Sequence, residues 1–446
     1  MPDRYITTLE KTIIKPLSPA MRQWGTITQI KGQSVNLEGL SDFIGLGDLI
    51  SSKNMLSGKD ITGEVISVEG RIITAMMFSD PAGLRVGQKA YIKCEQPLCP
   101  SEQWIGNTLN YRGETIEGHV PRSGATPIKL KGLPPPAILR KALGPRLTTG
   151  VAAIDTFLPI CQGQRMGLFA GSGVGKSTLL ATLAKSSNAD INIIALIGER
   201  GREVRHFVEH TLGPEGMKKT ILFVATSDEP SAMKLRTALL AIATAEYFRD
   251  AGKQVLFLFD SLTRYAEAHR DVALSAGEVP SLRAYPPSTF RALAALCERA
   301  GPGIDGVGDI SAIFSVLVAG SDMEEPVADM VRGILDGHVI LDREIAERGR
   351  YPAINLRRSV SRSLPNAATP EENKTLMKAR GYISNYEDAQ TLIRAGLYVP
   401  GSDIILDQAV NFYPELDDFI SKIGAMEIKD WFTQLNAIMT PADQET

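Results

Sequence analysis

Three arginines without an acidic neighbour stand within ten residues of the sequence. The stretch INLRRSVSRS, residues 354–363, contains Arg357, Arg358 and Arg362 and no aspartate or glutamate. A guanidinium group stays charged and binds carboxylates or phosphates through paired hydrogen bonds. We therefore expect an anionic ligand to supply the missing charge to at least one of these arginines.

A glycine-rich segment earlier in the chain indicates which anion this is. Residues 165–185, RMGLFAGSGVGKSTLLATLAK, run from a strand-like start through glycines into an apolar helical pattern. Glycines let backbone N–H groups face a phosphate chain, while a lysine reaches the β- and γ-phosphates and a serine hydroxyl holds Mg²⁺. A chance glycine turn is the alternative, and Ala170 replaces the usual first glycine. The candidate nucleotide-binding residues are Ala170, Gly171, Ser172, Gly173, Val174, Gly175, Lys176, Ser177 and Thr178, with Ser177 for the metal.

A glutamate at the end of the next apolar run is a candidate for activating water. The run INIIALIGE ends in Glu199, 23 residues after Lys176. One helix and one strand fit between them, so both side chains can lie at the carboxyl edge of one sheet, where open α/β folds bind ligands. Glu203 is the alternative for this role. An ion pair of Glu199 with Arg202 or Arg205 is the purely structural alternative.

An aspartate at the end of a third apolar run completes the candidate site. Five apolar residues, VLFLF, lead directly to Asp260. At a strand end, this carboxylate can bind the water shell of Mg²⁺. Helix capping is the alternative, since DSLTR can also open a helix. Arg264, four residues further on, can also face the phosphates.

Composition limits the classes of protein that fit the chain. Its 446 residues are 43% apolar, which favours two or three domains, and 48 basic against 51 acidic residues argue against a surface that coats nucleic acid. The four cysteines, Cys94, Cys99, Cys161 and Cys297, form no C-x-x-C pair, so we expect buried or loop thiols in a reducing compartment. No signal-like segment is present, and no apolar run reaches the roughly 20 residues that span a bilayer. We expect a cytoplasmic chain whose membrane association is peripheral.

The elements that must position these residues change in type along the chain. Residues 24–93 alternate short β-rich runs with glycine turns, which indicates a small closed barrel or a sandwich. The first 100 residues carry 11 basic and 10 acidic side chains, which favours an assembly role over oligonucleotide binding. Residues 150–365 alternate strands with helical segments, as in a parallel sheet wrapped by helices. The helical tail carries 13 acids and 6 bases over residues 371–446, as a solvated cap or as a docking surface for a basic partner.

Three stretches of the sequence indicate a known protein family. They are GERGREV, DSLTRYAEAHRDVALSAGEVPSLRAYPPSTF and ILDGHVILDREIAERGRYPAINLRRSVSR. They resemble the rotary ATP synthase catalytic subunits, and most closely the flagellum-specific export ATPases (FliI type) of type III secretion. The resemblance covers nearly the whole chain and is densest over 163–365. The stretch PAINLRRSVS also fits the nucleotide-binding alpha/beta ATPase signature. The stretch IGNTLNYRGETIEG departs from the family, at a peripheral link before the core.

The resemblance implies a multidomain fold and a ring. It consists of an N-terminal small β-barrel, a central α/β RecA-like P-loop ATPase with a mainly parallel sheet, and a C-terminal helical domain. Six copies would form a homohexamer with ATP and Mg²⁺ at each subunit boundary. The expected division is a partner-binding segment at 1–20, a β-barrel assembly domain at 21–96, the ATPase domain at 97–365 and the helical domain at 366–446.

The resemblance also implies a role for each matching residue. Lys176 and Ser177 bind phosphate and Mg²⁺, Glu199 activates water and Asp260 supports Mg²⁺. Arg200 and Arg264 contact the γ-phosphate region, and Tyr351 stacks on adenine. Arg362 enters the neighbour's site as an arginine finger. Tyr398 is a candidate for the other adenine face, which the resemblance leaves open. Simple packing is the alternative for Tyr351. Arg357 and Arg358 match no catalytic position and are expected to be interface or surface charges.

The partners that the resemblance implies belong to a secretion machine at the base of a flagellum. They are a stator-like negative regulator (FliH type), a central stalk protein (FliJ type), membrane proteins of the export gate, and chaperone–substrate complexes, with no nucleic acid. The protein would be cytoplasmic and peripherally associated with the inner membrane. ATP hydrolysis would deliver or unfold the exported proteins.

Three other functions share parts of this pattern. A virulence-type secretion ATPase would carry the same catalytic residues. An ATP synthase catalytic subunit is disfavoured, because the phosphate loop and the finger lie here in one chain, whereas synthases divide them between two related chains. A ring-shaped RNA translocase is disfavoured by the weakly charged first hundred residues.

Overall fold

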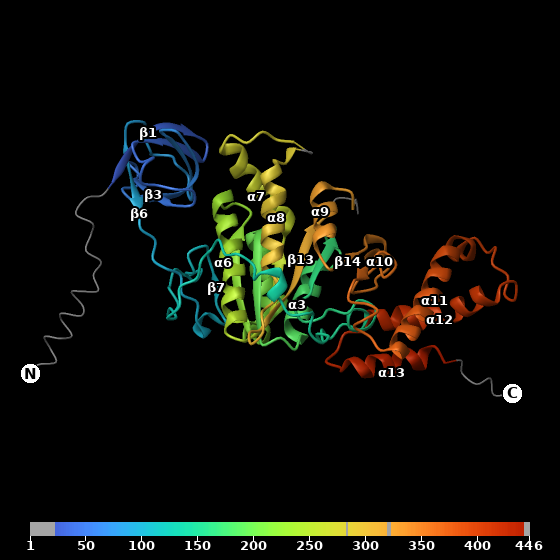
Figure 1. The fold of residues 1–446 in the computed structure, drawn as a ribbon. Helices are drawn as coiled ribbons and strands as arrows, with labels where there is room; N and C mark the ends of the chain where they lie inside the picture. Colours follow the sequence, from blue (N-terminus) through green and yellow to red (C-terminus); the bar gives the residue numbers. More distant parts are fainter. Residues whose placement is uncertain (1–22, 282–283, 319–322, 441–446) are drawn as a thin grey trace, which may run out of the picture. The chain divides into compact units, whose positions relative to one another are not determined.

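A computed structural model describes residues 23–281, 284–318 and 323–440 (Figure 1). The expected partner-binding segment at 1–20 lies outside these ranges. The chain forms two compact units, one that ends at Gln96 and takes in residues 275–277, and one that contains the rest.

The first unit is a closed barrel of six strands. They are β1 (Trp24–Lys31), β2 (Ser34–Glu38), β3 (Leu49–Lys53), β4 (Asp60–Glu69), β5 (Ile72–Met77) and β6 (Lys89–Lys93), in the order β1-β2-β5-β4-β3-β6. Alternate residues such as Ile73, Ala75 and Met77 are buried and fill the interior. Gly32 turns β1 into β2 with φ +52°, a conformation that other residues rarely adopt. The predicted barrel is therefore confirmed.

A mainly parallel sheet forms the centre of the second unit, as predicted. Its order is β15-β14-β8-β13-β11-β9-β10-β7; only β15 against β14, and the short β12 against β13, run antiparallel. The strands are β7 (Thr108–Leu109), β8 (Arg165–Ala170), β9 (Ile191–Glu199), β10 (Thr220–Thr226), β11 (Gln254–Asp260), β12 (Gly301–Pro302), β13 (Asp309–Leu317), β14 (Gly337–Leu341) and β15 (Val360–Ser361).

Helices cover both faces of this sheet, so its strands are apolar on both sides. In β9, Ile194 and Leu196 face one core, which α3 and the C-terminal helices complete, while Ile193 and Ala195 face a second core under α6, α8 and α9. The helical segments before residue 366 are η1 (Glu102–Trp104), η2 (Ala137–Leu139), α2 (Ala152–Thr156), α3 (Lys176–Ser186), α4 (Gly201–His206), η3 (Phe207–Leu212), α5 (Gly213–Met217), α6 (Ser231–Asp250), α7 (Leu262–Ser275), α8 (Pro287–Arg299), α9 (Pro326–Ile334) and α10 (Arg343–Glu347).

Three helices form the C-terminal part of the second unit, which confirms the predicted helical tail. They are α11 (Pro370–Arg394), α12 (Ile404–Ser421) and α13 (Ile428–Ile438). Thr369 and Glu372 form a reciprocal capping box that begins α11. Tyr386 of α11 stacks on Tyr413 of α12 with ring centroids 3.7 Å apart. Arg380 ties α11 to the ATPase part by donating a hydrogen bond to the carbonyl of Phe157 at 2.9 Å.

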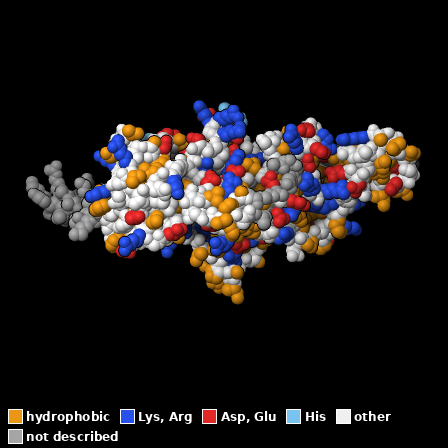
Figure 2. All heavy atoms as spheres, turned by 90° about the horizontal axis from the view of Figure 1, so that it is seen from above, with side chains coloured by type: hydrophobic (Ala, Val, Ile, Leu, Met, Phe, Trp, Pro, Cys, Tyr) orange, Lys and Arg blue, Asp and Glu red, His pale blue; other side chains and the backbone are white. Residues whose placement is uncertain are grey.

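The surface mixes both signs of charge. On the face shown in Figure 2, basic and acidic side chains are mostly interspersed over the described residues. All four cysteines are free, with Cys161 and Cys297 buried, as expected. Within the described ranges, no helix is both long and apolar enough to cross a bilayer. The expectation that nucleic acid is not a partner stays a prediction.

Candidate functional site

A glycine loop joins β8 to α3 at the carboxyl edge of the central sheet. Gly173 and Gly175 have φ angles of +79° and +90°, which glycine adopts readily and other residues do not. Gly175 immediately precedes α3, so the loop leads into the positive end of a helix. A methyl group on Gly175 would lie 3.2 Å from the Tyr351 ring, so this tyrosine packs against the loop.

Lys176, the first residue of α3, sits between two carboxylates. Its Nζ is 3.2 Å from Oε1 of Glu199 and 2.5 Å from Oδ1 of Asp260. Burial alone would lower the pKa of Lys176, but the two carboxylates outweigh it and raise the pKa above its ordinary value. The Lys176 ammonium group is therefore kept charged. It lies where the phosphates of a bound nucleotide would add further negative charge.

Four adjacent strands supply this cluster. Lys176 follows β8, Ser315 lies on β13, Asp260 ends β11 and Glu199 ends β9, and these strands are neighbours in the order β8-β13-β11-β9. The Ser315 hydroxyl donates a hydrogen bond to Oδ1 of Asp260 at 2.5 Å. Parallel strands bring their carboxyl ends to one edge, which explains why residues up to 139 positions apart meet here.

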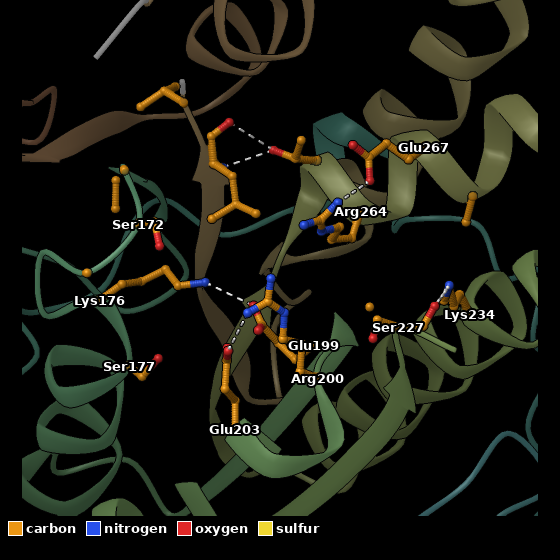
Figure 3. A pocket seen from close by; sticks show the side chains of 18 of the residues that line it. Ser172, Lys176, Ser177, Glu199, Arg200, Glu203, Ser227, Lys234, Arg264 and Glu267 are labelled. Atoms are coloured by element: carbon orange, nitrogen blue, oxygen red, sulfur yellow. Dashed lines mark hydrogen bonds and ion pairs between the residues drawn. The ribbon is translucent and has the colours of Figure 1, made fainter. Parts of the chain in front are cut away.

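A cavity of about 960 Å³ opens over the cluster (Figure 3). It is large enough to hold a nucleotide, since ligand pockets range over about 300–1,000 Å³. Of the sequence-predicted residues, the structure brings together on its lining Ala170, Gly171, Ser172, Gly173, Gly175, Lys176, Ser177, Thr178, Glu199, Arg200 and Arg264. Asp260 is 2% exposed and lies behind Lys176. Val174 is buried in the core beneath the loop and does not line the cavity.

Two arginines line the same cavity, each beside the glutamate three residues further along the chain. An Nη1 of Arg200 is 3.7 Å from Glu203, and Nη1 of Arg264 is 2.8 Å from Glu267 (Figure 3). The hydrogen bond that Arg264 donates to Glu267 raises the pKa of Arg264. Gly198 makes room for Arg264, because a Cβ on it would come within 2.8 Å of the arginine Cβ. Glu203, the alternative to Glu199, is engaged with Arg200.

Several lining residues carry no recognisable motif and were not predicted. Lys234 on α6 donates a hydrogen bond to the carbonyl of Ser227 at 2.9 Å, and burial lowers its pKa. Ser231, at the start of the same helix, donates to Asp271 at 3.0 Å. A cluster of polar residues in SDEPSAMK, just after an apolar strand, was the available signal for this wall of the cavity.

The donor set fits a magnesium nucleotide. Mg²⁺ takes oxygen ligands, and the Ser177 hydroxyl with the Asp260 carboxylate would hold it directly or through water. Positive-φ glycines and the start of α3 offer backbone N–H groups to phosphates, and Lys176 adds a charge. Tyr351 is 49% exposed beside Gly175, at the side of the loop rather than on the cavity lining. Tyr398 donates a hydrogen bond to Asp407 and does not line the cavity.

The three arginines of 354–363 have different surroundings. Arg357 forms an ion pair with Asp388 of α11 at 2.6 Å, so its counter-charge comes from its own chain. The backbone of Arg358 is hydrogen-bonded to Asn355 and His338. Arg362 is exposed, and within the described part of the chain its Nη2 donates a single, long hydrogen bond of 3.4 Å, to the carbonyl of Arg332.

Arg362 lies away from the cavity of its own chain. It follows β15, which runs antiparallel to β14 with Ser361 opposite Gly337, the first residue of β14. β14 runs parallel to β8, where Leu341 pairs with Ala170 at the start of the phosphate loop. The four residue steps from Gly337 to Leu341 correspond to about 13 Å of strand. The structure therefore places Arg362 at the opposite edge of the sheet from Lys176.

Comparisons with known proteins place this architecture among nucleotide-dependent export proteins. Residues 150–361 match the nucleotide-binding domain of the ATP synthase alpha/beta family, and residues 368–422 match the type III secretion EscN ATPase C-terminal domain. The chain is 40% identical to the flagellum-specific ATP synthase of Bacillus subtilis, covering 91% of this chain and 92% of that one. It is 39% identical to the SPI-2 type 3 secretion system ATPase of Salmonella typhimurium, covering 89% and 90%.

Solved structures give the same result for the fold. The assembled ATPase EscN of the enteropathogenic E. coli type III secretion system matches with a TM-score of 0.84 at 35% identity, covering 93% of this chain and 100% of that one. EscN in complex with its central stalk EscO matches with a TM-score of 0.83 at the same identity and coverage.

Proposed function

The chain belongs to the flagellum-specific and type III secretion ATPases of the ATP synthase alpha/beta family, and we infer from this that it hydrolyses ATP to drive type III protein export. The observation that carries the chemistry is Lys176, held between Glu199 and Asp260 beneath a nucleotide-sized cavity. No RNA-directed or synthase-type role is needed to explain this site.

We propose that the phosphates of ATP take over Lys176 from its two carboxylates. The glycine loop binds the phosphates through N–H groups, and Lys176 stabilises the charge that develops on the transferred group. Glu199, released from Lys176, orients the attacking water and withdraws its proton. Mg²⁺, when bound, neutralises phosphate charge. Asp260, which accepts a hydrogen bond from Ser315, and the Ser177 hydroxyl would supply the oxygens that hold it.

Three arginines are proposed to act on the γ-phosphate region from two chains. Arg200 and Arg264 line the cavity and would contact the phosphates from their own chain. Arg362 would complete the site of a neighbouring copy, because it lies at the far edge of its own sheet and is exposed. Tyr351 would stack on adenine beside the loop. The ring would be a homohexamer, and the barrel would serve its assembly.

We propose a finer placement of the protein, which its relatives support in part. The flagellum-specific relative of Bacillus subtilis supports export at a flagellar base. The FliH-type, FliJ-type, export-gate and chaperone–substrate partners stay expectations from the family resemblance. The stalk in the EscN complex supports a stalk partner here. The protein would be cytoplasmic and attached peripherally to the inner membrane. The division of the chain into domains stays a prediction, with boundaries at 1–20, 21–96, 97–365 and 366–446.

A virulence-type secretion role is the second candidate function. It is favoured by one observation, the 39% identity to the SPI-2 ATPase, which nearly equals the 40% identity to the flagellar relative. Both functions share the ATPase chemistry and differ in the exported proteins.

One set of measurements tests the proposal. The purified chain should hydrolyse ATP without RNA, and Lys176→Ala should abolish hydrolysis while leaving the fold intact by circular dichroism. In the source bacterium, Lys176→Ala should stop the secretion of hook and filament proteins if the role is flagellar. Loss of effector secretion with normal motility would instead support the virulence role, and hydrolysis that requires RNA would refute both.

A further inference from the structure

The segment that carries Arg362 is anchored by serines on alternate positions. Ser359, Ser361 and Ser363 are each at most 7% exposed, while Val360 and Arg362 between them face solvent. This alternation is that of an extended strand, in which successive side chains point to opposite sides. The backbone on both sides of Arg362 is therefore fixed from within, while its guanidinium is presented outward.

A buried glutamine holds this anchor. Gln164 has no exposed surface, and its Nε2 donates hydrogen bonds to the Ser361 hydroxyl at 3.0 Å and to the Asp336 carbonyl at 3.3 Å. Ser361 and Ser363 both donate to the Pro159 carbonyl, at 2.6 and 3.2 Å, and their hydroxyls lie 2.9 Å apart. The glutamine thus joins one network of buried hydrogen bonds that flanks Arg362 on both sides.

The peptide groups of Asp336 link the same network to the first residue of β8. The Asp336 N–H donates to the carbonyl of Arg165 at 2.8 Å, and its own carbonyl accepts from the N–H of Arg362 at 3.0 Å. The Asp336 carboxylate also binds the Arg165 side chain at 3.1 Å. Arg362 is consequently fastened to the amino end of β8, the strand whose other end is the phosphate loop.

We propose that Gln164 is a positioning residue for Arg362, setting where the guanidinium meets the site of a neighbouring copy. This inference rests on the trans role of Arg362 in the proposed function. Replacing the buried amide by an apolar side chain leaves the Ser361 hydroxyl and the Asp336 carbonyl with fewer partners, and buried polar groups move to regain them. A shift of about 1 Å in a positioned group can cost about 100-fold in rate.

Gln164→Leu tests this role, and Gln254→Leu is its matched control. Gln254 is the first residue of β11, at the same edge of the same sheet, and binds Asp309 at 3.0 Å rather than the Arg362 segment. Gln164→Leu should lower kcat about 10- to 100-fold with little change in KM or in the affinity for a fluorescent ATP analogue. Gln254→Leu should stay within about twofold of the parent on the same scale.

Mixed assemblies identify the edge of the sheet on which Gln164 acts. Mixing Gln164→Leu with Lys176→Ala should restore hydrolysis, because an intact phosphate loop from the first meets a well-placed Arg362 from the second. Mixing Gln164→Leu with Arg362→Ala should restore none, because both variants fail on the finger side. The reverse pattern, rescue by Arg362→Ala alone, would show that Gln164 acts on its own phosphate loop and would overturn the inference.

The mixture of Lys176→Ala with Arg362→Ala separates this inference from its premise. Recovery in that mixture establishes the trans finger, whereas no recovery in verified mixed rings would overturn the finger and the positioning role together. Recovery there combined with a fall in nucleotide affinity for Gln164→Leu would overturn the positioning role alone. Ser363→Ala, which keeps Gln164, should give the same pattern with a smaller loss, and it carries the test if Gln164→Leu does not fold.

Discussion

The two edges of the central sheet hold their cations in opposite ways. At the carboxyl edge, Lys176 is neutralised by Glu199 and Asp260 of its own chain, within 3.2 Å. At the amino edge, Arg362 has no carboxylate partner among the described residues and reaches only a carbonyl, at 3.4 Å. Both positions are precisely built, so the difference lies in where the counter-charge comes from. One edge is complete within the chain and the other is arranged to be completed from outside.

Removing the outward arginine tests this contrast most severely. Arg362→Ala should lower kcat by about 10³- to 10⁵-fold, the range typical of an arginine finger, while ATP binding to the intact phosphate loop persists. Arg362→Lys should restore little, because an ammonium cannot reproduce the forked geometry. Steady-state hydrolysis with a nucleotide-binding assay measures both. Near-normal turnover of Arg362→Ala would remove the difference between the edges.

The inward edge is tested by Glu199→Gln, which keeps shape and loses basicity. Turnover should fall about 10²- to 10⁴-fold, the range of general base catalysis, with ATP binding and assembly retained. Glu203→Gln is the control, since Glu203 lines the same cavity and contacts Arg200. If Glu203→Gln proved the more damaging change, the role of water activation would move to Glu203. Single-turnover hydrolysis separates the two.

Ser315→Ala tests how far the carboxyl edge depends on a residue that holds Asp260 in place. Its hydroxyl donates to buried Asp260, and a hydrogen bond to a charged group contributes about 1.5–3 kcal/mol. We expect a comparable loss in free energy of unfolding and a fall of about tenfold in turnover, since Asp260 is left less firmly placed. Urea unfolding and hydrolysis in parallel check this. Unchanged values for both would show that Lys176 alone holds Asp260.

The smallest effect is expected for an arginine of the same stretch that already has its counter-charge. Arg357→Ala removes an exposed ion pair with Asp388, of a kind worth about 0.2–1 kcal/mol. Turnover should remain within about twofold of the parent, since a change of this size is small against catalytic effects. A loss as large as that of Arg362→Ala would mean that the stretch acts as one cluster.

The sequence alone was sufficient to locate candidate site residues where they form contiguous patterns. The phosphate loop, from Ala170 to Thr178, and the strand-end position of Glu199 and Asp260 are contiguous patterns, and the barrel and the parallel sheet follow from periodicity. The roles assigned to these residues stay predictions. Contacts that depend on distant segments left no local trace. Ser315 is a single serine within the apolar strand β13. Gln164 is a single glutamine just before the apolar strand β8.

The counter-charge of Arg357 shows the same limit. No acidic residue lies near Arg357 in the sequence. Its partner Asp388 is 31 residues away on α11 and comes close only when that helix packs. Lys234 was missed for a related reason, since a lysine near the start of a helix resembles any solvated lysine until its burial is known. Folding, rather than residue type, creates these pairings.

The closure of the N-terminal barrel affects how copies of the chain can contact one another. A strand at the edge of an open sheet offers unpaired N–H and C=O groups to any other chain, which invites aggregation. The barrel has no such edge, and the outermost strands of the central sheet, β7 and β15, are only two residues long. These edges therefore give other chains little backbone to pair with, which leaves side-chain surfaces as the main means of association between copies.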